Sequence, residues 1–277
     1  MYLRKGLTLY SNLASIAEQL SINGGNVPAT DATGLYYHPG SYIPTKEWRR
    51  LDLPETKLLL TKKPGADFSK RICVGEIPET LKSSFLALNL QACTQLDQVY
   101  PKIKENEEIV KVINKELDDF LRPFSTTKKY KFHRITRAMP NRETITCHYI
   151  DERFVYIGLH IDQSKHFTPH TAYKSGNRIS INLSKETRYL VFINLTLIQV
   201  FNLIKERVDP SKTEINPDNI AYLFFTHYPD YPAVRIGVKP YQYYIAPTDN
   251  FFHDATTYGN HDIDITLVYT GLFDRFQ

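Results

Sequence analysis

The second half of the chain, from residue 129 to residue 273, contains a series of short segments rich in β-branched and aromatic residues, and in several of them apolar and polar residues alternate. Alternation with a period of two is typical of half-buried β-strands, and turn residues separate the segments. The expected strands are YKFHRITRA (130–138), ETITCHYI (143–150), FVYIGLHID (154–162), RISINLS (178–184), RYLVFINL (188–195), AYLFFTHY (221–228), PAVRIGVK (232–239), PYQYYIA (240–246) and DITLVYTGLF (264–273).

The connections between these segments predict how the strands pair. The first three follow one another through short turns, which favours an antiparallel meander. The segments at 178–184 and 188–195 are separated by residues 185–187, where Lys185 and Glu186 form a turn short enough for a hairpin. A run of short strands fits a closed or nearly closed β-structure better than a parallel α/β sheet.

The first third of the chain has helical periodicity instead. Apolar residues recur at helical spacing over residues 9–20, and Gly24 would end that helix. A second helix is expected over residues 81–99, and a third from Asn106, a good N-cap, to the residue before Pro123. Their apolar stripes predict helices that pack against the outside of the β-structure.

These patterns predict an α+β fold, mainly β, in one domain over residues 1–277. Residues 1–125 would form a helical N-terminal support. Residues 126–277 would form the β core, with a helical insertion around residues 195–220 because the segment from Leu197 to Val208 reads as a helix.

Composition excludes several classes of protein. Hydrophobic residues make up 42% of the 277 residues, which is typical of a globular core, and the net charge of +4 comes without a basic run, so nucleic-acid binding is disfavoured. Three cysteines far apart in sequence argue against a disulfide framework or structural zinc site and favour a reducing, cytoplasmic location. No apolar run is long enough to predict a membrane span or signal peptide.

The segment at 154–162 contains the strongest candidate for chemistry. If it is one strand, His160 and Asp162 project to the same side, because successive side chains point to opposite faces. An imidazole and a carboxylate at this spacing can both bind one metal ion. With a second histidine they make the 2-His-1-carboxylate set of non-haem Fe(II) oxygenases.

GLHID, followed by NRISINLS and a distant FFHD, resembles the Fe(II)/2-oxoglutarate-dependent dioxygenases, over roughly the second half of the chain. The resemblance implies a double-stranded β-helix, a jelly-roll or cupin-like barrel, with the helical region packed outside it. It implies iron bound by His160, Asp162 and a distal histidine at the open end, and 2-oxoglutarate as cosubstrate. A retained Asp162 further implies hydroxylation, desaturation or ring closure, because halogenases of the family lack this carboxylate.

Three histidines compete for the distal position. His227 precedes further expected strands, and His261 continues into an apolar face. His253 follows a turn and two phenylalanines, and the resembled family presents its distal ligand in this way. His253 is therefore the expected ligand, and Asp254 is expected to orient its imidazole.

The resemblance also implies a basic residue that pairs with the far carboxylate of 2-oxoglutarate. Many members of the family place an arginine on the strand after the distal histidine, but no Lys or Arg lies between His253 and Arg275. Arg178 is the first candidate because it shares a strand face with polar residues, and its planar fork matches a carboxylate. Arg235 and Lys174 are the second and third candidates.

Other histidines have simpler interpretations. His166 and His170 are expected in a loop near the mouth of the site, and His133 and His148 on the earlier strands are expected to be packing residues.

The sequence thus predicts an oxygenase that hydroxylates a small molecule, amino acid or peptide with O2. Two alternatives stay open, a non-haem iron oxidase that does not use 2-oxoglutarate and a non-catalytic β-helix binding module. No nucleic-acid or membrane partner is expected, and the sequence indicates neither the substrate nor the oligomeric state.

Overall fold

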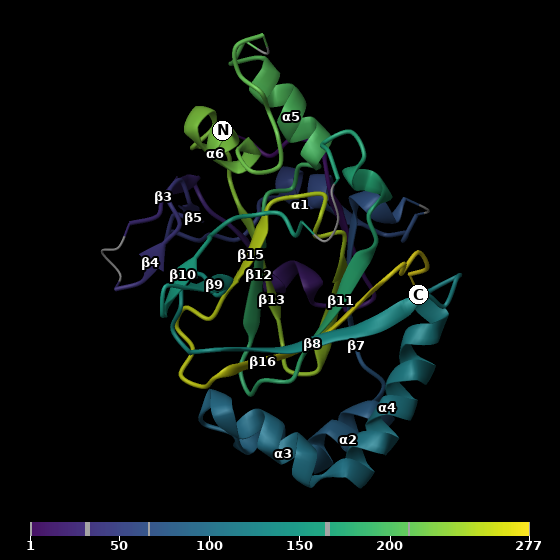
Figure 1. Ribbon diagram of the computed structural model, residues 1–277. Helices are drawn as coiled ribbons and strands as arrows, with labels where there is room; N and C mark the ends of the chain where they lie inside the picture. Colours follow the sequence, from purple (N-terminus) through teal and green to yellow (C-terminus); the bar gives the residue numbers. More distant parts are fainter. Residues whose placement is uncertain (1, 31–33, 66, 164–166, 210, 277) are drawn as a thin grey trace.

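The computed structural model describes residues 2–30, 34–65, 67–163, 167–209 and 211–276 (Figure 1). Two β-sheets lie at its centre. The larger has seven strands in the order β6-β1-β7-β14-β11-β16-β8, and the smaller has four in the order β15-β12-β13-β2. The larger sheet consists of β6 (Leu60–Thr61), β1 (Thr8–Ser11), β7 (Arg71–Glu76), β14 (Gln242–Ala246), β11 (Asn177–Asn182), β16 (Asp264–Gly271) and β8 (Tyr130–Ala138). The smaller consists of β15 (His253–Thr256), β12 (Arg188–Phe192), β13 (Val234–Val238) and β2 (Leu20–Ile22).

A shared apolar core joins the two sheets. Leu9 and Val74 from the larger sheet pack with Leu190, Phe192 and Ile236 from the smaller one, and all five are almost fully buried. Burying these side chains removes apolar surface from water, which is the main favourable term in folding. The molecule is therefore a layered α+β structure, mainly β, as the sequence predicts.

Neither large sheet closes on itself within the described residues, because each strand order has two free ends. Two smaller sheets lie beside them. One is the three-stranded sheet of β4 (Tyr36–Tyr37), β10 (Arg153–Tyr156) and β9 (Cys147–Ile150), and the other pairs β3 (Asn26–Pro28) with β5 (Tyr42–Pro44).

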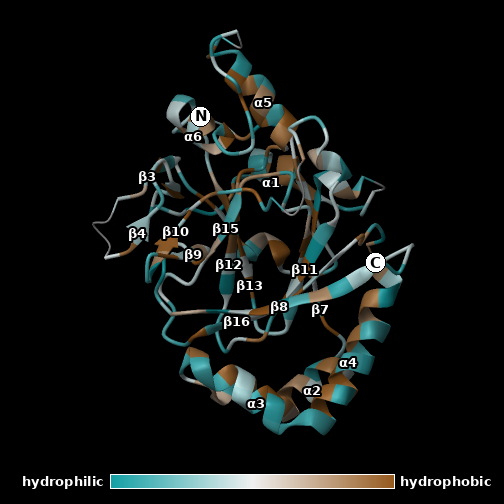
Figure 2. Cartoon of the chain, in the orientation of Figure 1, coloured by the Kyte–Doolittle hydropathy of each residue, from teal (hydrophilic) through white to brown (hydrophobic). Residues whose placement is uncertain are grey.

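Helices cover the far face of the larger sheet, below it in Figure 1. They are α2 (Glu79–Leu88), α3 (Val99–Glu105) and α4 (Glu107–Leu121). Figure 2 shows hydrophobic and hydrophilic residues alternating along α4, and its apolar side packs with Ile179 and Ile181 of β11. The predicted start of this helix after Asn106 and its packing outside the sheets are confirmed.

A second helical group lies at the opposite end, where α5 (Leu197–Lys205) and α6 (Ile220–His227) pack on each other. The expected α5 is present, but the prediction of a strand over residues 221–228 is wrong. Phe224 and Phe225 are adjacent and both fully buried, and they contact Phe252. Adjacent side chains of a half-buried strand would face opposite ways, whereas a helix can bury both.

The predicted N-terminal helix over residues 9–20 is also wrong. This stretch forms β1, a 3₁₀ turn at Ile16–Gln19 and β2, and Leu9 is opposite Leu60 and Ile72 in parallel pairings. The helical spacing of its apolar residues comes from two short strands that enter the same core. Helix α1 (Leu53–Leu59) begins later, with a capping box between Asp52 and Glu55.

Two predicted pairings are wrong as well. Strand β8 pairs with β16 and not with β9, so only β9 and β10 form a hairpin of the expected meander. Strands β11 and β12 do not form a hairpin, because the chain crosses between the sheets at Lys185 and Glu186. No helix of the described residues is long and apolar enough to cross a membrane.

Candidate metal centre

The segment that contains His160 and Asp162 differs from the single strand that the sequence predicts. Strand β10 ends at Tyr156, and Gly158 adopts a left-handed backbone with φ of 62°. A Cβ at Gly158 would lie 2.3 Å from the carbonyl oxygen of Tyr42, so only glycine fits there. After this break the chain leaves the three-stranded sheet of β4, β10 and β9 and runs beside the four-stranded sheet.

Backbone hydrogen bonds fix the new course of the segment. The amide of His160 donates to the carbonyl of His253 at 3.0 Å, and the amide of His253 donates back at 2.8 Å. The amide of Asp162 donates to the carbonyl of Thr248 at 3.1 Å. This isolated antiparallel bridge brings residues that lie far apart in sequence next to each other at the edge of β15.

His160, Asp162 and His253 form a compact cluster in which the ligand atoms all lie within 4.8 Å of one another. Asp162 Oδ1 is 3.8 Å from His160 Nε2, and Asp162 Oδ2 is 3.4 Å from His253 Nε2. Among the described residues, no other group of three His, Cys, Asp or Glu side chains meets this condition. Two imidazoles and one carboxylate are a donor set suited to Fe(II).

Both imidazoles present Nε2 to the carboxylate because Nδ1 faces a backbone carbonyl. The Nδ1 of His160 lies 2.7 Å from the carbonyl oxygen of Gly158, and the Nδ1 of His253 lies 3.4 Å from that of Phe251. A proton on Nδ1 leaves a lone pair on Nε2, which is the form that binds metal.

Burial and charge tune this cluster. Burial, helped by the nearby His253, lowers the pKa of His160 to about 4. Burial alone would raise the pKa of Asp162, but His253 and Arg178 outweigh it and hold that pKa well below its ordinary value. The site therefore combines a neutral imidazole at His160 with an ionised carboxylate, as metal binding requires.

Arg178, the first candidate for binding 2-oxoglutarate, lies at this cluster. Its Nε is 3.0 Å from Asp162 Oδ2. As the sequence predicts, Arg178 and Ser180 face the same cavity, while Ile179 and Ile181 face the helices on the other side of the sheet.

The cavity that contains the cluster has a volume of about 420 Å³ and lies against both sheets. Sequence reasoning missed one of its lining residues, Arg188 on β12. Arg188 is only 5% exposed and shares its strand face with Leu190 and Phe192, which belong to the core between the sheets. A lone arginine on an otherwise apolar strand face is the sequence signal that could have found it.

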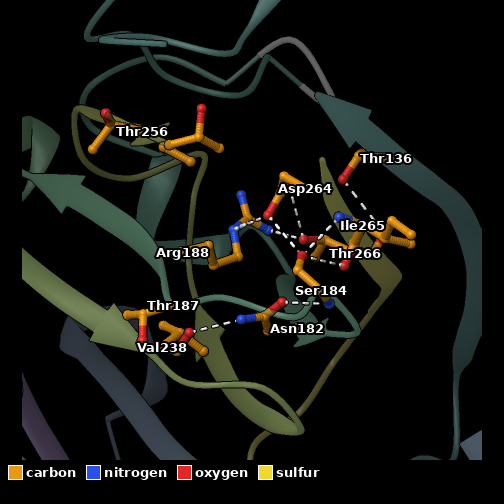
Figure 3. A network of polar contacts seen from close by, with 12 residues as sticks. Thr136, Asn182, Ser184, Thr187, Arg188, Val238, Thr256, Asp264, Ile265 and Thr266 are labelled. Atoms are coloured by element: carbon orange, nitrogen blue, oxygen red, sulfur yellow. Dashed lines mark hydrogen bonds and ion pairs between the residues drawn. The ribbon is translucent and has the colours of Figure 1, made fainter. Parts of the chain in front are cut away.

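Figure 3 shows the polar network around Arg188. Its Nε lies 3.6 Å from Asp264 Oδ1, and its Nη1 donates to the hydroxyl of Thr266. Asp264 also accepts from the hydroxyl of Ser184. Within the described residues Nη2 of Arg188 has no hydrogen-bond partner, so one side of the guanidinium remains available in the cavity.

The other predicted anchors lie elsewhere. Arg235 is stacked between the rings of Trp48 and Tyr189 and donates to Ser21, and it does not line the cavity of the metal cluster. Lys174 lines a separate, adjoining cavity.

The competing histidines are also away from the cluster. His227 ends α6, and the side chain of His261 is 90% exposed beside Glu186. His170 packs on the ring of Phe201, and His166 lies outside the described residues. Of the three candidate distal ligands, only His253 lies beside His160 and Asp162.

Asp254 does not orient His253, contrary to the sequence prediction. It is the next residue on β15 and faces the other way, where its carboxylate accepts from the hydroxyls of Thr144 and Thr146 and from the amide of Ala255. Burial raises the pKa of Asp254 to about 6, although these hydrogen bonds act to lower it. Its contacts hold Thr144 and Thr146 in place, and Thr146 lines the cavity.

Comparisons with known proteins add a structural similarity of limited extent. No family model matches the sequence, and no curated protein matches it. The chain is similar in structure to the Kdo hydroxylase KdoO, a non-heme Fe(II) alphaketoglutarate dependent dioxygenase, in complex with cobalt(II), with a TM-score of 0.41 and 13% identity over 75% of this chain and 81% of that one. The same hydroxylase in complex with succinate and Fe(III) gives a TM-score of 0.40 and 12% identity over the same shares.

Proposed function

We propose that the protein is an Fe(II)/2-oxoglutarate-dependent oxygenase that hydroxylates a small molecule, amino acid or peptide. The observation that carries this proposal is the cluster of His160, Asp162 and His253, which line one cavity and have ligand atoms within 4.8 Å of one another. Three protein ligands on one side of a metal ion leave positions open for a cosubstrate and O2.

We also propose that the two large sheets form a double-stranded β-helix. Support comes from the order in which the chain visits them. Strands β11, β14 and β16 belong to the larger sheet, and β12, β13 and β15 to the smaller, so the chain passes between the sheets after β11, β13, β14 and β15. Repeated crossing of this kind is the connectivity of a jelly roll.

The side chains fit an iron ion. His160 and His253 would each supply Nε2, and Asp162 would supply one carboxylate oxygen. Iron bound there would supply the redox chemistry by which O2 oxidises a C–H bond while the keto acid loses CO2. The protein's part is to hold the three ligands, to keep Asp162 ionised and to exclude bulk water from the cavity.

The far carboxylate of 2-oxoglutarate needs a cationic partner in the same cavity. Arg178 remains a candidate, but it contacts Asp162, one of the proposed metal ligands, whereas the far carboxylate is the end of the cosubstrate that points away from the iron. We place the anchor on Arg188 instead, because it is buried, charged and has Nη2 available. A guanidinium in a cavity shielded from water binds a carboxylate more strongly than one at the surface.

Succinate formation tests the function. Purified protein supplied with Fe(II), 2-oxoglutarate and O2 should release succinate slowly without a substrate, and Asp162→Ala should abolish this release. Iron binding without succinate formation would favour an iron oxidase that does not use 2-oxoglutarate. Absence of both would favour a non-catalytic binding module.

A further inference from the structure

A second cavity, of about 770 Å³, adjoins the one that contains the metal cluster. The two share His133 and Arg178 as lining residues, so a molecule in the second cavity would lie next to the metal cluster. A volume of this size is typical of sites for small molecules.

The charge of this cavity is unbalanced. Lys129, Lys131, Lys174 and Arg178 line it, against one described carboxylate, Asp249. The three lysines come from two separate segments, the start of β8 and the 3₁₀ turn at Ala172–Lys174. Within the part of the chain that the structure describes, none of these lysines forms an ion pair with an acidic side chain.

The larger sheet places two of these cations on one face, with one strand between them. Thr270 of β16 is directly opposite Lys131 of β8 on one side and Arg178 of β11 on the other. Residues opposite one another on neighbouring strands project to the same face, so both cations stand on one face with only Thr270 between them. Because Asp162 already pairs with Arg178, the uncompensated charge here is that of Lys131, which a bound anion would neutralise.

The pKa of His133, between the two cavities, is consistent with a positive field. Burial is the main cause of the lowered pKa of His133, and the charges of Arg134 and Arg178 lower it further. Apolar surface completes the lining, from Tyr130, Phe167 and Leu272. The cavity therefore offers cations for acidic groups and apolar contacts for a carbon skeleton.

We propose that this cavity binds the oxygenase's primary substrate and that the substrate is an anionic small molecule, a carboxylate or phosphate. Lys131 and Lys174 bind its acidic group, and its carbon skeleton extends past Arg178 toward the metal cluster. This inference rests on the proposed function, since it reads the bound anion as the substrate.

Anion binding to the metal-free protein tests the inference without any turnover. Isothermal titration with pyrophosphate and with citrate represents the two anion chemistries, and removing metal prevents either from binding through iron. At least one should bind at one molecule per chain, with an affinity that falls as NaCl is raised because the attraction is electrostatic. The tighter of the two would identify the acidic group.

Lysine variants assign the binding to this cavity. Lys131→Gln combined with Lys174→Gln should weaken the affinity by about tenfold or more, because two cations near the anion are lost. Lys57→Gln, at an exposed lysine of α1 away from the cavity, is the matched control and should leave the affinity unchanged. Absence of saturable binding by either anion, or an equal loss in Lys57→Gln, would overturn the proposal.

His253→Ala separates this inference from the proposed function. If the cavity binds anions as inferred, this variant should lose Fe(II) binding but keep the pyrophosphate or citrate affinity of the wild type. Anion binding in a wild-type protein that binds no iron would refute the oxygenase while retaining the anion site. Iron-dependent succinate formation without anion binding would refute only the anion site.

Discussion

The guanidinium of Arg178 lies against the carboxylate of Asp162, with Nε 3.0 Å from Oδ2. The same oxygen faces Nε2 of His253 at 3.4 Å. Arg178 thus helps to keep Asp162 ionised and to fix which way its carboxylate turns. This contact gives Arg178 a role at Asp162 that differs from the one proposed from the sequence, which is binding of the cosubstrate.

Variants of the two arginines distinguish these roles. If Arg188 binds the far carboxylate, Arg188→Lys should raise the KM for 2-oxoglutarate by about tenfold or more, since lysine keeps the charge but cannot contact Asp264, Thr266 and the carboxylate together. Arg178→Ala should mainly weaken Fe(II) binding, by about tenfold, as expected when support for a metal ligand is lost. A large rise in KM for Arg178→Ala with unchanged iron affinity would return the anchor to Arg178.

Arg188 should also contribute strongly to stability. Arg188→Ala would leave Asp264, which is 1% exposed, without its cationic partner, and an uncompensated buried charge typically costs about 3–5 kcal/mol. Lys185→Ala, which removes a partly exposed ion pair with Asp262, should cost about 1 kcal/mol or less. Urea unfolding of both variants measures the difference, and equal losses would contradict the role of the buried pair.

Gly158 should be required for the geometry of the metal ligands. Gly158→Ala combines an unfavourable φ with a Cβ 2.3 Å from the Tyr42 carbonyl, and should destabilise the protein by about 3 kcal/mol or more. Gly259→Ala is a matched control, because Gly259 also has a positive φ, of 85°, but nothing within 4 Å of its Cβ. That control should cost about 1 kcal/mol.

Thermal unfolding compares the two glycine variants. Gly158→Ala should also bind Fe(II) more weakly, because His160 Nδ1 faces the carbonyl of Gly158. Equal melting temperatures for the two variants would mean that the close approach at Tyr42 has no energetic consequence.

Much of the architecture could be predicted from local pattern. The residue patterns of the sequence identified β11, β12, β13, β14 and β16 as strands. The two-residue spacing of His160 and Asp162 predicted that their side chains lie together. The pairing of strands could not be predicted in this way, because β8 meets β16 across more than a hundred residues and the alternation of each strand is the same whichever neighbour it pairs with.

The remaining errors have local causes. The spacing of apolar residues between Leu9 and Leu20 is compatible with one helix and also with two strands that share a core. Residues 221–228 form a nearly continuous apolar run, and periodicity alone cannot tell whether such a run is a helix or a strand. The break at Gly158 and the course of residues 158–162 depend on a contact with Tyr42, which lies in a distant segment of the sequence. Local pattern therefore could not predict them.

The distal ligand is tested by a pair of histidine variants. His253→Ala should remove measurable Fe(II) binding, because one of three ligands is lost. His261→Ala should retain the wild-type affinity, since that side chain is 90% exposed and away from the cluster. Reversal of this ranking in anaerobic metal-binding assays would move the ligand from His253 to His261.

Anaerobic titration of the wild-type protein with Fe(II), with and without 2-oxoglutarate, tests directly whether His160, Asp162 and His253 bind iron. We expect one Fe(II) per chain in the wild type and none in Asp162→Ala. We also expect 2-oxoglutarate to add the visible metal-to-ligand absorption of a keto acid chelated to Fe(II). A wild-type protein that binds no Fe(II), or binds it equally well without Asp162, would contradict the assignment of this cluster as a metal centre.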